Sequence, residues 1–204
     1  MNAFIHEHCG GSVDCATAWC AAGEAVCRAA VARAGLIKSC VLFGTQCVPQ
    51  DPDQVVAMQS VMAETPPEAF VDMIWNGLPN SALSDQSNEL VATRRAQVSE
   101  WGNYCLSLCQ WGSEVYGPGG LMAEMTRNSP FWRDWGRVAV PVYVIAGSDD
   151  VQMLSGMLNL VAAVPHGRLE LLPGVGAVPF VEASEVFIEK VIAFLESIGH
   201  AKVV

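Results

Sequence analysis

Residues 139–150 read AVPVYVIAGSDD, and this stretch decides the fold class of the chain. It is an almost unbroken apolar run, rich in β-branched and aromatic side chains, that ends in a turn of small and acidic residues. Residues 37–43 (IKSCVLF) have the same character. Runs of this kind are typical of strands that are covered on both faces in a parallel sheet. We expect two further, shorter strands at 12–18 (SVDCATA) and 168–172 (RLELL).

Helical segments separate these strands. Residues 21–34 (AAGEAVCRAAVARA) are rich in alanine, which favours helix and permits close packing against a sheet. Residues 2–9, 152–164 and 184–198 also read as helices. The last of them carries one apolar stripe, made of Phe187, Val191, Phe194, Leu195 and Ile198. The alternation of helices and strands predicts right-handed crossovers and a parallel α/β sheet.

A long insertion interrupts this alternation between residues 46 and 137. Its apolar residues recur at helical intervals, so we expect an all-helical lid inserted into a core formed by residues 1–45 and 138–204. Most tryptophans of the chain fall in the insertion: Trp75, Trp101, Trp111, Trp132 and Trp135. These side chains suit the roof of an apolar ligand site, but aromatic residues also dominate ordinary packing, so both interpretations stay open.

The composition indicates a globular protein and excludes several classes of partner. Of the 204 residues, 51% are hydrophobic and 16% are charged, with a formal net charge of -10. Nucleic-acid binding is driven by lysine and arginine, of which there are only 11, so no nucleic acid is expected. The sequence shows neither an apolar run long enough for a bilayer nor a signal peptide, so we expect no membrane association and a cytoplasmic location.

Three segments carry a resemblance to a known family. Residues 139–150 are similar to the seventh strand of an α/β-hydrolase and to the G-x-x-D turn that follows it. Residues 172–182 (LPGVGAVPFVE) resemble the eighth strand and the segment G-H-x-P-x-x-E, and residues 39–45 (SCVLFGT) resemble the sixth strand. The resemblance implies that Asp150 is the acid of a catalytic triad. It also places Ala177 at the position of the catalytic histidine.

The same resemblance locates the nucleophile. Counting back from the sixth strand leads to residues 18–23 (AWCAAG), where the family has the strained turn G-x-S-x-G with alanines here in place of both glycines. Cys20 stands at the nucleophile position, where backbone N–H groups of a helix N-terminus stabilise a thiolate. The N–H of Ala21 would be one donor of the oxyanion hole. Alternatively, Cys20 is one more buried cysteine, and Asp150 caps the next helix.

The chain lacks the residue that connects nucleophile and acid. In a triad an imidazole takes up the proton of the nucleophile and later activates water, which the methyl group of Ala177 cannot do. None of His6, His8, His166 and His200 falls at the required place. One explanation is a deliberate substitution of the histidine that arrests an acyl-enzyme, and another is a degenerate site. We expect no cofactor. We also expect no metal ion, because His6 and His8 point to different sides of their helix.

The resemblance covers only strands 5 to 8 of the family's sheet, whose order is 1-2-4-3-5-6-7-8. Residues 12–18 would then form an exposed edge where strand 3 belongs, and an unpaired apolar edge favours aggregation. The second oxyanion donor, which comes from the loop after strand 3, would be missing as well. We therefore expect a second polypeptide that supplies strands 1 to 4, or a second copy of this chain, to cover the edge.

Three hypotheses for the function follow. In the first, the chain is part of a heterodimeric acyl hydrolase or acyltransferase, similar to a thioesterase, in which Cys20 accepts the acyl group of a small apolar substrate. In the second, the chain is a hydrolase homologue without activity that acts as a binding or scaffolding protein, which the alanines at positions 18, 22 and 177 favour. In the third, it is a truncated gene product that aggregates when made alone.

Overall fold

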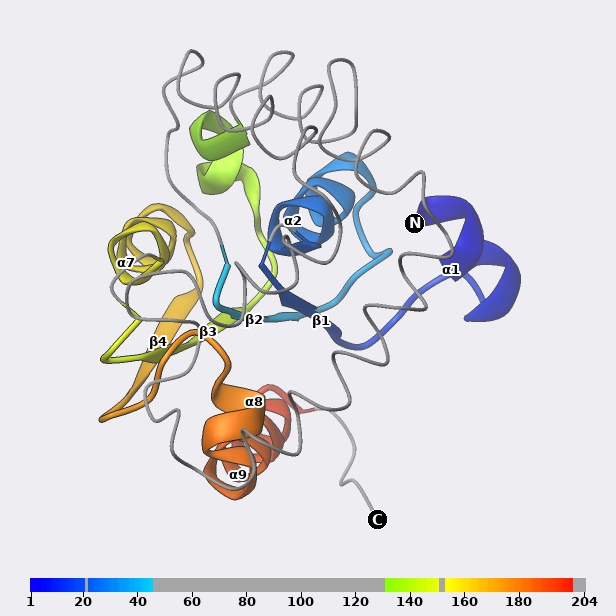
Figure 1. Cartoon of the computed structure of the whole chain (residues 1–204). Helices are drawn as coiled ribbons and strands as arrows, with labels where there is room; N and C mark the ends of the chain where they lie inside the picture. The colour runs from blue at the N-terminus through cyan, green and yellow to red at the C-terminus, as the bar shows by residue number, and fades with distance from the viewer. Residues whose placement is uncertain (21, 46–130, 151–152, 200–204) are drawn as a thin grey trace, which may run out of the picture. The chain divides into compact units, whose positions relative to one another are not determined.

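The computed structural model describes residues 1–20, 22–45, 131–150 and 153–199. Within them, the strands form one parallel sheet in the order β1-β2-β3-β4 (Figure 1). The strands are β1 (Ala16–Trp19), β2 (Cys40–Phe43), β3 (Val142–Gly147) and β4 (Gly167–Leu172). The parallel sheet predicted from the apolar runs is confirmed.

Helices cover both faces of this sheet. One face carries α2 (Ala22–Ala32), the 3-10 helix η3 (Phe131–Arg137) and α7 (Leu154–Ala163), and the other carries α8 (Pro179–Glu182) and α9 (Ser184–Ser197) (Figure 1). The short helix α1 (Asn2–His8) inserts Ile5 into the core on the side of α2. The four helices expected outside the insertion are confirmed, and their ends agree to within two residues.

Both faces of the central strands are buried, which explains their unbroken apolar sequence. All four residues of β2 and all six of β3 are buried. Because successive side chains of a strand point to opposite faces, Leu42 and Val144 pack on the side of α2 and α7. Val41 and Ile145 pack on the side of α9. The polar group within these strands is the Tyr143 hydroxyl, which donates to Glu170 at 3.3 Å.

The apolar stripe predicted for residues 184–198 packs on the sheet as α9. All five of its members join one cluster with side chains of β2 and β3. The ring of Phe194 stacks on Tyr143 with 4.8 Å between centroids, and Phe187 meets Phe43 edge to face at 5.0 Å. These aromatic contacts hold α9 under the centre of the sheet.

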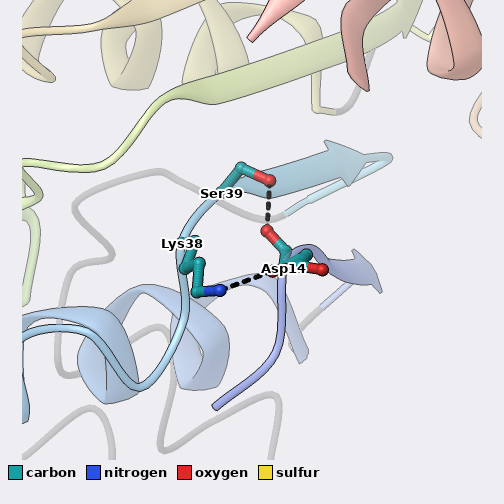
Figure 2. Close-up of polar contacts among 3 residues, drawn as sticks. All are labelled: Asp14, Lys38 and Ser39. Atoms are coloured by element: carbon teal, nitrogen blue, oxygen red, sulfur yellow. Dashed lines mark hydrogen bonds and ion pairs between the residues drawn. The ribbon is translucent and has the colours of Figure 1, made fainter. Parts of the chain in front are cut away.

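A small polar cluster joins the segments that lead into β1 and β2 (Figure 2). The buried hydroxyl of Ser39 donates to the main-chain carbonyl of Asp14 at 2.7 Å, and Lys38 forms an exposed ion pair with the Asp14 carboxylate at 2.7 Å. The ladder is interrupted here, since Val13 and Ile37 form only an isolated bridge and regular pairing begins with β1. The strand is therefore shorter than the expected range 12–18.

We predict that Ser39→Ala lowers the free energy of unfolding by about 1 kcal/mol, because it removes a hydrogen bond whose donor is shielded from water. Lys38→Ala is the matched control in the same cluster, since an exposed ion pair contributes only about 0.5 kcal/mol. Urea unfolding followed by circular dichroism measures both values. If the two variants lose the same free energy of unfolding, the buried hydroxyl of Ser39 does not contribute more than the exposed ion pair.

The insertion predicted as a lid lies outside the described residues over 46–130. Its last residues, 131–137, form η3, which belongs to the same compact unit as the sheet. Trp135 of η3 is 7% exposed and packs in the core with α2 and α7, so this tryptophan is a packing residue. The lid itself stays a prediction.

None of the helices in the described part of the chain is long and apolar enough to cross a membrane.

Candidate active site at the carboxyl ends of the strands

The candidate residues all follow the carboxyl end of a strand. Cys20 comes directly after β1, Asp150 follows β3, and Ala177 lies in the loop between β4 and α8. In a parallel sheet the carboxyl ends of all strands lie on the same side, and the ligand-binding and active sites of α/β proteins lie there. The loop that contains Ala177 contacts the carboxyl ends of β1, β2 and β3, so these segments meet in one part of the molecule.

Cys20 stands in a strained turn between β1 and α2. Its φ is 56°, and it is the one non-glycine residue with a positive φ in the described part of the chain. The left-handed conformation costs a residue with a Cβ about 1 kcal/mol. The Cys20 N–H donates to the Phe43 carbonyl at 3.4 Å, and the Gly23 N–H donates to the Cys20 carbonyl at 3.2 Å. This half-buried cysteine therefore has the strand–turn–helix geometry that a nucleophile elbow requires.

The turn depends on Gly23, which directly follows the motif. The two positions where the motif G-x-S-x-G has glycine are occupied by Ala18 and Ala22. A Cβ at Gly23 would overlap the buried side chain of Thr45, so the glycine lets α2 begin close to the end of β2. No role was expected for Gly23 from the sequence, although a glycine within an alanine-rich helix often indicates close packing. Ala21, the expected oxyanion donor, lies outside the described residues.

Asp150 is buried, with an exposed fraction of 3%. Its Oδ1 accepts the N–H of Met153 at 3.0 Å, and its carbonyl accepts the N–H of Leu154 at 3.1 Å. These contacts tie Asp150 to the turn that leads into α7, whose N-cap is Met153. The neighbouring Asp149 is exposed and accepts a hydrogen bond from the Ser148 hydroxyl at 2.8 Å. Of the two aspartates, Asp150 is thus the one shielded from solvent.

The loop that precedes α8 is held against the turn after β3. The Asp149 N–H donates to the Val175 carbonyl at 2.9 Å, and the Gly174 N–H donates to the Ser148 hydroxyl at 2.8 Å. Gly147 has no room for a side chain, because a Cβ there would overlap the Val175 carbonyl. The two motif segments, G-x-x-D and the loop of residue 177, are therefore docked on each other.

Two side chains complete the support of position 177. Glu182 accepts the N–H of Gly176 on its Oε1 at 3.0 Å and so closes the loop. Ala177 is half-buried, and its carbonyl accepts the indole N–H of Trp19 at 3.1 Å. From the sequence, Glu182 was identified only as the last residue of the segment that resembles G-H-x-P-x-x-E, without a structural role. The contact with Trp19 joins residues too far apart in the chain for any local pattern to reveal it.

No described histidine replaces the missing imidazole at position 177. His6 and His8 are exposed on α1, where the His6 ring lies by Gly11 ahead of β1. His166 is exposed at the amino end of β4, the opposite end from the candidate site. His200 lies outside the described residues. The described residues also contain no group of three or more His, Cys, Asp or Glu side chains that could hold a metal ion.

The other described cysteines differ from Cys20 in their surroundings. Burial, followed by the charge of Glu24, raises the pKa of Cys27 to about 12. Burial, followed by neighbouring thiols, raises the pKa of Cys40 as well. Thiols of this kind stay protonated at neutral pH and are poor nucleophiles, as expected for core cysteines. Cys9, in contrast, is exposed at the end of α1.

Comparison with known proteins identifies the fold. No protein-family model matches the chain, and no curated protein matches it either. MenH from S. aureus has a TM-score of 0.65 and 16% identity, over 96% of this chain and 72% of that one. A thermophilic esterase from Thermogutta terrifontis has a TM-score of 0.72 and 16% identity, over 98% and 70%. A serine hydrolase from Cycloclasticus zankles has a TM-score of 0.66 and 16% identity, over 91% and 64%.

The sheet, its helices and these similarities define the class of the fold. The chain has an α/β-hydrolase fold, of which the described residues form a partial sheet of four parallel strands with flanking helices. The chain spans between 64% and 72% of the three similar chains. A likeness at 16% identity defines the architecture and leaves the reaction open.

We predict that Gly147→Ala lowers the free energy of unfolding by about 2–3 kcal/mol, because the added methyl group must displace the Val175 carbonyl and the loop of residue 177. Gly136→Ala in η3 is the matched control, since its Cβ would meet only the Ala163 carbonyl, at an ordinary distance of 3.8 Å. Urea unfolding of both variants gives the comparison. If both substitutions lower the free energy of unfolding by the same amount, the loop of residue 177 is not docked closely on β3.

Proposed function

We propose that this chain is part of an α/β-hydrolase-type acyl hydrolase or acyltransferase, similar to a thioesterase, in which Cys20 is the nucleophile. The backbone of Cys20 carries the proposal, since its φ of 56° belongs to a residue with a side chain. Strained residues persist only where their surroundings hold them, and they cluster at active sites. The buried Cys27 and Cys40 lie in regular helix and strand and have raised pKa values.

The proposed reaction is acyl transfer to the Cys20 thiol. Its thiolate attacks the carbonyl carbon of a thioester or ester, and a carbon–sulfur bond forms. The bond to the leaving group breaks, and this group departs with the electron pair and takes up the proton that the thiol has lost. The N–H of Ala21 is proposed as one donor to the oxyanion. Water or another acceptor then attacks the thioester on Cys20 and restores the thiol.

Asp150 and the side chain at position 177 are the other proposed members of the site. An imidazole at position 177 would take the proton from the thiol and activate water for the second step, with the Asp150 carboxylate orienting it. The methyl group of Ala177 does neither. We therefore expect the first step to be slower than it would be with an imidazole at position 177, and the thioester on Cys20 to be long-lived.

An apolar acyl group is the substrate class that we propose. Three aromatic rings meet beside the turn of Cys20, with centroids of Phe180 and Trp19 at 6.0 Å and of Phe180 and Phe43 at 5.4 Å. Phe180 is 38% exposed, so it offers apolar surface at the carboxyl ends of the strands. Ligand sites are lined mainly by such apolar and aromatic side chains.

We also propose that further strands cover the outer edge of β1. In the described part of the chain, β1 pairs with β2 on one side, and no described strand lies on its other side (Figure 1). An open strand edge is a ready template for pairing. A second polypeptide that supplies strands 1 to 4 would close this edge, as would a second copy of the chain. Strong hydrogen-exchange protection of the outward β1 amides in an isolated monomer would contradict the proposal.

A non-catalytic binding or scaffolding role is the second candidate, and Ala177 is the observation that favours it. The loop of residue 177 keeps its supporting contacts to Trp19 and Glu182 although the side chain that would do chemistry is a methyl group. A protein that has lost catalysis but retains its fold would look like this. The two candidates differ in whether an imidazole at position 177 creates turnover.

We predict that an apolar phenyl thioester acylates Cys20 in the parent chain at pH 8. Peptide mass spectrometry should show the acyl group on Cys20 and none on Cys27, whose raised pKa keeps its thiol protonated at this pH. Cys9 is exposed and reports ordinary thiol reactivity in the same sample. Acylation of Cys9 at a rate equal to or above that of Cys20 would speak against a special nucleophile.

We predict that Ala177→His converts the long-lived thioester into a turnover intermediate. The rate of hydrolysis of the acyl group on Cys20 should rise by about 10²-fold or more, since general base catalysis contributes at least that much. Ala177→Gln is the matched control, because its side chain has comparable size but no basic ring. Equal hydrolysis rates in both variants would favour the binding or scaffolding role.

A further inference from the structure

The side chain of Trp19 joins two parts of the chain that are far apart in the sequence. Trp19 is the last residue of β1, and its indole N–H donates to the Ala177 carbonyl at 3.1 Å across 158 positions. The bond lies in a slot above Gly44, where a Cβ would overlap the Ala177 carbonyl and stand 2.7 Å from the Trp19 Nε1. With a φ of 48°, Gly44 is also in a backbone region that disfavours a side chain.

Contacts from three directions hold the loop of residue 177. One ties it to the turn after β3 through Asp149, and another ties it to α8 through Glu182. The third ties it to β1 through Trp19, the residue that directly precedes Cys20. Of these three, the contact with Trp19 is the one that relates the loop to the strand of the proposed nucleophile.

We propose that Trp19 is a positioning residue, whose indole N–H sets the separation between the side chain at position 177 and the thiol of Cys20. The inference rests on the proposed function, because this separation matters only if the two positions share a reaction. Proton transfer requires the two groups within hydrogen-bond reach, so a small shift of the loop has a large effect. Because Trp19 binds the backbone of residue 177, it acts on any side chain placed there.

The test measures alkylation of Cys20 by iodoacetamide at pH 7, resolved by peptide mass spectrometry. In Ala177→His a neighbouring imidazole promotes the thiolate, so we expect Cys20 to react about tenfold faster than in the parent chain. Trp19→Phe keeps an aromatic ring and removes the N–H donor. In the Ala177→His background it should slow alkylation about tenfold, and in the parent chain by a clearly smaller factor, which is the signature of coupling.

Trp135→Phe is the matched control, because it removes an indole N–H from the core and should leave alkylation unchanged in both backgrounds. Circular dichroism establishes that each variant is folded, and Trp19→Leu, which also lacks a donor, replaces Trp19→Phe if the latter does not fold. An equal effect of the Trp19 substitution in both backgrounds would show a merely structural role and overturn the proposal. The proposal would also be overturned if Ala177→His left the alkylation rate of Cys20 unchanged. Neither result bears on acylation of Cys20 in the parent chain, which the thioester experiment decides separately.

Discussion

Burial on both faces of β2 and β3 is the constraint on which the rest of the structure depends. Every residue of these strands is shielded from solvent, so a polar side chain in them would lose its hydration unless it finds a partner, as the Tyr143 hydroxyl does in Glu170. Polar groups are pushed to the two ends of the sheet. Asp14, Lys38 and Ser39 gather ahead of β1 and β2, while Cys20 and Asp150 follow strand ends on the opposite side. The location of the candidate site is thus a consequence of how the sheet is packed.

Three glycines bring the segments at the carboxyl ends close together. Gly23, Gly44 and Gly147 each stand where a Cβ would overlap a neighbouring side chain or carbonyl. A glycine lets two backbones approach more closely than any other residue does. The first of them brings α2 to the end of β2, and the other two bring the loop of residue 177 onto β2 and β3. The strain at Cys20 is therefore held by dense packing and by backbone hydrogen bonds around the turn.

The fold could be predicted from the sequence to the extent that burial leaves a pattern along the chain. Apolar runs revealed β2 and β3 because both faces of these strands are buried, and a helical stripe revealed α9 because its apolar residues pack on one cluster. The start of β1 differs from the expected one because regular pairing begins only at Ala16, after the segment in which the Ser39 hydroxyl binds the Asp14 carbonyl, and no periodicity reports this. Motif spacing likewise placed the three candidate site residues at strand ends. It could not reveal the role of Trp19, whose partner lies 158 positions away.

The support of position 177 is made almost entirely to backbone atoms, and this decides how the site responds to the residue that stands there. Trp19 binds the carbonyl of Ala177 itself, Glu182 binds the N–H before it, and Asp149 binds a carbonyl earlier in the loop. None of these contacts needs a particular side chain at position 177. An imidazole can therefore be lost from this position, or introduced there, without disturbing the loop that would carry it. The loop geometry beside Ala177 is therefore the one that a histidine introduced at position 177 would meet, whichever of the proposed functions the chain has.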